Sequence, residues 1–115
     1  CGHGVSHEDS WEKESEMIVQ TVQISCMTDK AEIVQMALAD VVDDARNHEP
    51  GTQDYRVLRC DQDDKVLFTT IECFSDEAAM KLHNESDAVA RFFKVAETLL
   101  SAPPEVLVSL QVVQM

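Results

Sequence analysis

Residues 48–86 read HEPGTQDYRVLRCDQDDKVLFTTIECFSDEAAMKLHNES, and their pattern decides the fold. The proline and glycine near the start end a helix. The two apolar runs that follow are typical of strands, and the acidic sequence DQDD between them is typical of a hairpin turn. A further helix begins near residue 75. The stretch therefore predicts a helix end, a strand, a turn, a second strand and a new helix.

The second of these strands contains a carboxylate, Glu72, and a histidine, His83, follows on the new helix. A strand advances about 3.3 Å per residue and a helix rises about 1.5 Å per residue. If the helix folds back onto the strand, Glu72 lies roughly 10 Å before the strand end and His83 roughly 12 Å back from it. We expect the two side chains at the same level, while the sequence leaves open whether they face each other.

The composition limits the class of protein. A chain of 115 residues with 44% hydrophobic residues is large enough for one globular domain with its own core. Its net charge of −13, with no basic patch, argues against binding to nucleic acid or to an anionic membrane surface. No apolar run is long enough to span a membrane. We expect neither nucleic acid nor membrane among its partners.

Four cysteines are present, at Cys1, Cys26, Cys60 and Cys73. Their spacing matches neither a CxxC pattern nor a zinc-binding pattern, and three of them occur in apolar strand contexts. Reduced thiols and a cytoplasmic location are therefore favoured over disulfides. The chain has no phosphate-binding glycine loop and no nucleophile-elbow serine, so we expect no cofactor and no metal in the domain.

The first sixteen residues are expected to form a loosely attached or disordered tail, because they are polar and lack an amphipathic period. Trp11 could fold back as a single anchor. If Cys1 is the true terminus, Cys1-Gly2-His3 could chelate Cu(II) or Ni(II), with His7 as a further ligand. A lipoprotein beginning at the same cysteine is the other alternative. The folded domain is expected to span residues 17–115.

Residues 17–27 alternate in part and predict the first strand. Thr28-Asp29, with Glu32 following, is typical of a capping box that begins a helix. One apolar stripe on this helix is expected to pack against a sheet. The residues of the stripe are Val34, Leu38, Val41 and Ala45.

Residues 53–60 and 65–74 are expected to pair as a hairpin. If Cys60 pairs with Lys65, Tyr55 lies opposite Thr70 and Gln53 lies opposite Glu72. Opposed residues share a face of the sheet, and two groups follow. One face would carry Gln53, Tyr55, Val57, Phe68, Thr70, Glu72 and Phe74. The other would carry Leu58, Cys60, Leu67, Ile71 and Cys73.

The helix from Ser75 is expected to pause at Asn84, to restart at Ser86 and to run to Leu100, before Pro103 forces an exit. Residues 105–114 predict the last strand. The order βαββαβ indicates an α+β, ferredoxin-like fold with an antiparallel sheet. Helices cover one face of such a sheet, yet these strands are apolar on both faces. We therefore expect a homodimer whose two sheets pack face to face.

The chain from about residue 17 to residue 115 also carries an ordered set of residues typical of one family. They are His48-Glu49-Pro50-Gly51, Tyr55, Glu72, Phe74, Asp76, His83 and Ser86. In this respect the chain resembles the antibiotic-biosynthesis monooxygenase (ABM) domains, which are dimeric α+β barrels. The resemblance implies a pocket between helices and sheet in each subunit. Members include cofactor-free oxygenases that convert phenolic or anthrone-like compounds to quinones, quinol oxidases, isomerases of signal molecules, haem-degrading enzymes and proteins of unknown activity.

The haem-degrading branch is set aside on residues. That branch uses an Asn on the first strand, a Trp at the end of the third strand and an axial His on the last helix. In this chain residues 17–27 contain no Asn, and Phe74 and Phe93 stand at the other two positions. Without the iron ligand that chemistry has no anchor.

The resemblance leads to a mechanistic hypothesis. His83 would act as the base that makes an electron-rich phenolate or carbanion for reaction with molecular oxygen. Glu72 would fix the tautomer of His83, and Tyr55 would hydrogen-bond a substrate oxygen. The walls for a small aromatic metabolite would come from Phe68, Thr70, Phe74, Phe92 and Phe93.

Each of these residues could instead have a purely structural role. The Glu72–His83 pair could simply join helix to strand, and phenylalanines at helical spacing are more often core than pocket. Glu49 and Gly51 are assigned to turn chemistry, and His48 to the helix dipole. Two functions follow: a cofactor-independent monooxygenase that oxidises a phenol, hydroquinone or anthrone to a quinone, or a non-oxidative dimeric module that binds or isomerises a small molecule.

Overall fold

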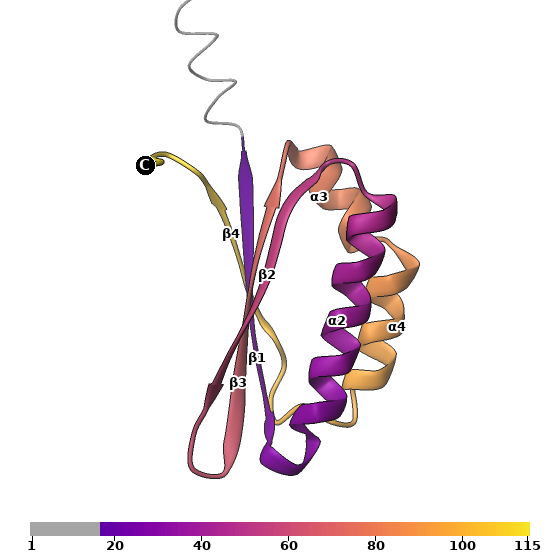
Figure 1. Cartoon of the computed structure of the whole chain (residues 1–115), viewed down its shortest axis with the longest axis vertical. Helices are drawn as coiled ribbons and strands as arrows, with labels where there is room; N and C mark the ends of the chain where they lie inside the picture. The colour runs from indigo at the N-terminus through magenta and orange to yellow at the C-terminus, as the bar shows by residue number, and fades with distance from the viewer. Residues whose placement is uncertain (1–16) are drawn as a thin grey trace, which may run out of the picture.

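Strands and helices form two layers in residues 17–115, the part of the chain that this computed structural model describes (Figure 1). The elements in chain order are β1 (Ile18–Met27), the 3-10 helix η1 (Thr28–Lys30), α2 (Ala31–His48), β2 (Thr52–Asp61), β3 (Lys65–Phe74), α3 (Glu77–Asn84), α4 (Asp87–Ala96) and β4 (Glu105–Leu110). All strand pairs are antiparallel, in the order β2-β3-β1-β4. The predicted α+β, ferredoxin-like βαββαβ fold is confirmed. The predictions for the tail and for Trp11, Cys1, His3 and His7 lie outside the described residues.

Helix α2 packs on the sheet through the stripe that its periodicity predicted. Val34, Leu38, Val41 and Ala45 are buried, as is Ala31 at its first residue. The predicted capping box is wrong, because the chain leaves β1 through η1 and the helix begins without a side-chain cap. Instead, the Thr28 amide donates to the carbonyl of Asp64 in the hairpin turn, at 3.3 Å.

The register of the β2–β3 hairpin differs from the prediction by two residues. Tyr55 lies opposite Glu72 instead of Thr70, because the Gln62 amide bonds the Lys65 carbonyl at 2.8 Å and the turn is tighter than expected. An irregularity between Thr52 and Asp54 removes Gln53 from the predicted pair with Glu72. Side chains alternate with a period of two, so a shift of two residues leaves the predicted faces intact from Tyr55 onward, whereas at the irregularity Thr52 takes the place of Gln53 opposite the end of β3.

The helices after β3 begin with the expected caps, shifted by one residue at the first. Asp76, rather than Ser75, caps α3 by accepting from the Ala79 amide at 2.8 Å, and Ser86 caps α4 by accepting from the Val89 amide at 3.2 Å. Helix α4 ends at Ala96, short of the predicted Leu100, which instead bridges to Cys26 beside β1.

The last strand is also shorter than predicted. It ends at Leu110 rather than at residue 114. Its pairing with β1 extends from Leu110 opposite Ile18 to Glu105 opposite Gln23. Beyond the end of the strand, the Gln111 amide still donates to the Met17 carbonyl at 3.0 Å.

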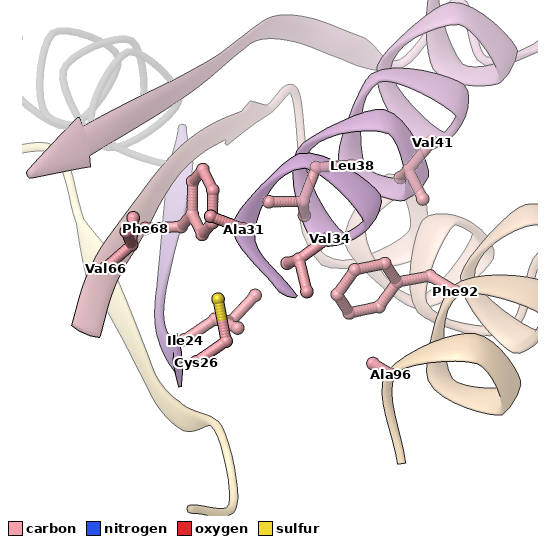
Figure 2. Close-up of a cluster of buried hydrophobic side chains, with 10 residues drawn as sticks. All are labelled: Ile24, Cys26, Ala31, Val34, Leu38, Val41, Val66, Phe68, Phe92 and Ala96. Atoms are coloured by element: carbon pink, nitrogen blue, oxygen red, sulfur yellow. The ribbon is translucent and has the colours of Figure 1, made fainter. Parts of the chain in front are cut away.

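The core lies between the sheet and the helices (Figure 2). Ile24 and Cys26 from β1 and Val66 and Phe68 from β3 meet the α2 stripe, with Phe92 and Ala96 of α4 closing the cluster. Each fully buried side chain of this size stabilises the fold by about 1.5–3 kcal/mol relative to exposure. The core therefore fixes α2 and α4 on the sheet, and with them the layer that carries the site.

Gly51 lets β2 begin close to α3. A Cβ atom at this position would lie 2.6 Å from the Cβ of Ala79, which is inside normal contact distance. The Gly51 carbonyl also accepts from the Ser75 amide at 2.9 Å. The turn after α2 and the start of α3 are therefore held together at one end of the sheet.

The opposite face of the sheet carries no helix in residues 17–115 (Figure 1). Ile71 and Leu67 are partly exposed there, and Leu58 and Leu107 are largely exposed. On β4 the helix-side residues Val106, Val108 and Leu110 are also more than half exposed. None of the helices in the described residues combines the length and apolar character that a membrane span requires.

Candidate active site

His83 is buried between two carboxylates. Its side chain is 2% exposed, on the last turn of α3. The Nδ1 atom lies 2.8 Å from Oε1 of Glu49, and the Nε2 atom lies 3.4 Å from Oε1 of Glu72. The sequence-based expectation that Glu72 and His83 lie at one level agrees with this contact. The shorter contact, however, is with Glu49.

Glu49 comes from the end of α2. It follows the last helical residue, and its amide still bonds the Ala45 carbonyl at 3.0 Å. Its Oε1 atom accepts from the Thr52 hydroxyl at 2.8 Å as well as facing His83. Its Oε2 atom is buried without a hydrogen-bond partner among the described residues. The burial of this carboxyl group is therefore compensated by the hydrogen bonds of its Oε1 atom with Thr52 and His83.

Glu72 projects from β3 and is held by neutral donors. Gln20 Nε2 donates to Oε1 at 2.8 Å, and the Thr70 hydroxyl donates to Oε2 at 2.6 Å. Gln20 is directly opposite Glu72 on β1 and exchanges hydrogen bonds with Asn84, at 3.0 and 3.1 Å. These donors supply the hydrogen bonds that a buried carboxyl group requires.

Two aromatic rings enclose His83. The Tyr55 ring approaches it edge-on, with centroids 5.4 Å apart, and the Phe74 ring lies 5.3 Å away. Burial, together with the charge of Glu72 and a hydrogen bond to it, raises the pKa of Tyr55 well above its ordinary value. Tyr55 is therefore a neutral phenol that donates hydrogen bonds.

Burial and the two neighbouring carboxylates have opposite effects on the pKa of His83. Burial alone lowers the pKa of an imidazole, but the hydrogen bonds and charges of Glu72 and Glu49 outweigh burial and raise the pKa of His83 above its ordinary value. The cluster is thus a proton-binding unit of one imidazole and two carboxylates in a protected interior.

A cavity of about 210 Å³ opens beside this cluster. His83, Glu72 and Tyr55 lie in its polar wall together with other polar side chains, and apolar side chains from β1, α2, α4 and β4 form the rest. Its lining comprises Gln20, Val22, Ile24, Leu38, Val41, Tyr55, Thr70, Glu72, His83, Asn84, Val89, Phe92, Phe93 and Val106. Phe93 and Val106 are about half exposed, so they mark the rim.

The structure brings together most of the residues named from sequence. His83, Glu72 and Tyr55 share one wall, and Thr70, Phe92 and Phe93 line the same cavity. Phe68 and Phe74 do not line it: Phe68 belongs to the core cluster, and Phe74 packs against His83. His48, exposed at the helix end, pairs with Asp44 at 3.1 Å.

The sequence does not identify three polar residues of the site, which are Gln20, Asn84 and Glu49. Gln20 and Asn84 look like ordinary polar positions until the β1–β3 register places Gln20 opposite Glu72. Glu49 was assigned to the turn, where its neighbours Pro50 and Gly51 indeed belong. Its side chain nevertheless points back to His83, a contact between residues far apart in sequence that only the fold creates.

The other described side chains form neither a metal site nor a site with an activated cysteine. Within residues 17–115, no group of three or more His, Cys, Asp or Glu side chains is arranged to hold a metal ion. The described cysteines, Cys26, Cys60 and Cys73, are free. Burial raises the pKa of the Cys26 and Cys73 thiols, which makes them poorer nucleophiles at neutral pH.

Comparison with known proteins supports one family. The model of the family described as antibiotic biosynthesis monooxygenase matches residues 17–95. No functionally curated protein matches the chain by sequence.

Solved structures agree in fold. A Caulobacter crescentus CB15 protein, described as a candidate antibiotic biosynthesis monooxygenase, superposes with a TM-score of 0.77 at 19% identity, covering 93% of this chain and 98% of its own. A similar Nitrosomonas europaea protein gives 0.76 at 20% identity, covering 84% and 91%. The Pseudomonas aeruginosa protein PA3566 gives 0.74 at 24% identity, covering 86% and 97%. At these identities the likeness shows a shared fold.

The raised pKa of His83 predicts how stability depends on pH. An imidazolium favoured by the folded state contributes stability fully below about pH 6.5, the ordinary pKa of the unfolded chain, and this contribution is lost as pH rises through the higher folded pKa. We expect the free energy of unfolding, measured in urea at a series of pH values, to fall over this window. His83→Gln should cost about 3–5 kcal/mol at low pH, because it leaves two buried carboxylates without their cation.

A matched control is His48→Gln, which removes the exposed histidine that pairs with Asp44. It should change stability by at most about 1 kcal/mol. If the wild type and His83→Gln lose stability in parallel across this pH range, His83 does not carry the buried charge.

Proposed function

The chain belongs to the antibiotic biosynthesis monooxygenase family, and on that premise we propose that it is a cofactor-independent monooxygenase oxidising a phenol, hydroquinone or anthrone-like small molecule to a quinone. The observation that carries the proposal is a proton-binding cluster, Glu49, His83 and Glu72, set into the wall of a largely apolar cavity. Apolar walls suit an aromatic ring, and the cluster supplies the base that such a ring needs.

The first step is removal of a proton. Nε2 of His83, next to Glu72 on the cavity side, takes the proton from a substrate hydroxyl or activated carbon. The imidazolium that forms lies between two carboxylates, so its charge is balanced at once. When substrate binds, the neutral phenol of Tyr55 turns its single proton from Glu72 to the substrate oxygen that becomes electron-rich.

The second step is reaction with molecular oxygen. The deprotonated substrate gives an electron to O₂, and the two radicals combine in a new carbon–oxygen bond. At an activated methylene or at an unsubstituted ring carbon of a phenol, loss of water from the resulting peroxide leaves a carbonyl, so that CH₂ and O₂ become C=O and H₂O. A hydroquinone instead gives two electrons and two protons to O₂, which leaves a quinone and H₂O₂. The substrate carbon is oxidised and oxygen is reduced, without a further electron donor.

The size of the cavity narrows the substrate. An engineered protein cavity of about 150 Å³ accommodates benzene, and the cavity here is about 210 Å³. A one-ring or small two-ring phenol or hydroquinone therefore fits within it. A three-ring anthrone would need to extend past Phe93 and Val106 at the rim.

A second function is favoured by the same cluster. A histidine between two carboxylates can remove a proton from one atom and return it to another. This chemistry isomerises a small molecule and needs no oxygen. The alternative is thus a non-oxidative dimeric module that binds or isomerises a small metabolite, and oxygen consumption distinguishes the two.

We further propose that the chain acts as a homodimer. The sheet face opposite the helices exposes Ile71, Leu67, Leu58 and Leu107, and a second copy of the same face is the simplest cover. The free thiols in the described residues fit a reducing compartment, for which we propose the cytoplasm.

Oxygen uptake tests the proposed activity. With a panel of one-ring and two-ring hydroquinones, the wild type should consume oxygen at a rate that rises with pH through the raised pKa of His83, because only the neutral imidazole is a base. His83→Gln should lower the rate by about 10²–10⁴-fold, and Glu72→Gln should also lower it. An oxygen electrode measures the rate, and mass spectrometry identifies the quinone.

His48→Gln is the control for this experiment and should retain the full rate, because His48 lies on the surface outside the cavity. Full uptake by folded His83→Gln would remove His83 from the mechanism. Substrate isomerised without oxygen consumption would favour the second function.

Sedimentation tests the dimer. The wild type should sediment with about twice the 12.9 kDa mass of the chain. Ile71→Lys should shift it to the monomer, because a charge would be buried in the interface. Ile33→Lys makes the same change at an exposed position on α2 and should leave the dimer intact. A wild type that sediments as a monomer at micromolar concentration would refute the proposal.

A further inference from the structure

The two nitrogens of His83 are held unequally. The 2.8 Å contact of Nδ1 with Glu49 is a full hydrogen bond, whereas the 3.4 Å contact of Nε2 with Glu72 is at the outer limit for one. A neutral imidazole carries one proton and donates from one nitrogen only. The shorter contact favours the tautomer with that proton on Nδ1 and the lone pair on Nε2, toward Glu72.

Glu49 is itself held on several sides. Its amide donates to Ala45, its carbonyl accepts from the Thr52 amide at 3.0 Å, and its side chain accepts from the Thr52 hydroxyl. It does not line the cavity beside His83, but lines a separate hollow between α2 and β2. Glu49 thus reaches the cavity only through the imidazole.

Glu72 does not need His83 to stay in place. The side chains of Gln20 and Thr70 hold its two oxygens at 2.8 and 2.6 Å. Tyr55 and Phe74 restrict the imidazole ring on its sides but do not select which nitrogen carries the proton. Among the described side chains around the ring, Glu49 makes the shorter contact, 2.8 Å against 3.4 Å for Glu72, and so has the stronger influence on which nitrogen carries the proton.

We propose that Glu49 is the positioning residue of the site: it binds the Nδ1 proton of His83 and thereby leaves Nε2 free to accept the proton of the substrate. In the net step, a proton leaves the substrate and binds to Nε2. The ring becomes an imidazolium, and its Nδ1–H continues to donate a hydrogen bond to Glu49. The inference rests on the proposed role of His83 as the base.

The charged and titratable groups around His83 come from each element packed against it. They are Glu49 at the end of α2, Glu72 on β3 and the phenol of Tyr55 on β2; Gln20 on β1 and Asn84 on α3 are neutral. Removing the charge of Glu49 leaves Glu72 as the one carboxylate supporting the imidazolium. The pKa of His83 should then fall.

Nitrogen-15 NMR of the His83 ring tests the proposal on the wild-type protein, without any substrate. Above the pKa of His83, the neutral ring should carry its proton on Nδ1. In Glu49→Gln the pKa of the ring should fall by roughly one to three pH units. If hydroquinone oxidation is observed, its pH profile should move to lower pH with a lower kcat, while KM stays nearly constant because Glu49 does not line the cavity.

Asp44→Asn provides the matched control. It removes the carboxylate that pairs with the exposed His48 and should leave the His83 signals unchanged. A wild-type ring protonated on Nε2, or an unchanged pKa in folded Glu49→Gln, would overturn the proposal. Because these signals need no turnover, a lack of oxidase activity with the expected NMR result would count against the proposed function and not against the role of Glu49.

Discussion

The contact on which the site depends is a buried histidine placed between two buried carboxylates. A charge in the protein interior is costly unless a partner of opposite charge and good hydrogen-bond geometry compensates for it. His83 and Glu72 are each 2% exposed, and Glu49 is 8% exposed. The three come from α3, β3 and the end of α2, so the fold must join these elements before the charges can balance.

The same proton links stability and reactivity. Glu49 and Glu72 raise the pKa of His83, which favours the imidazolium and strengthens the folded state. As pH rises through that pKa, the proton leaves and the stabilising charge is lost, and the neutral ring is then able to act as the base that we propose. A more basic histidine is also a stronger proton acceptor, so the carboxylates that stabilise the fold also equip the site for its proposed chemistry.

Much of this arrangement could be predicted from the sequence. Periodicity gave the bounds of β3 and the buried stripe of α2, and the rise per residue of strand and helix placed Glu72 level with His83. The hairpin register was wrong by two residues because turn length depends on a backbone hydrogen bond, Gln62 to Lys65, that no residue type announces. Apart from Gln53 at the irregularity, the predicted faces were still correct, since alternation survives an even shift.

The parts of the site that the sequence does not predict are those that depend on contacts between residues far apart in the chain. Glu49 sits among turn residues, and nothing local indicates that its side chain meets a histidine on another helix. Phe68 and Phe74 share a sheet face with Thr70 and Glu72, yet helix packing buries them outside the cavity that Phe92 and Phe93 line. A face can be read from a period of two, whereas the boundary between core and cavity depends on how the helices lie across it.

If His83 is a base beside the cavity, it should take the proton of a phenol bound there, and the ionisation of the bound phenol shows whether it does. The absorption spectrum of 4-nitrophenol differs between its neutral and ionised forms, and its single ring suits a cavity of about 210 Å³. We expect the bound molecule to be ionised at pH values below its solution pKa, and we expect His83→Gln to abolish this effect. A bound phenol that stays neutral up to its solution pKa would show that His83 is not a base toward the cavity.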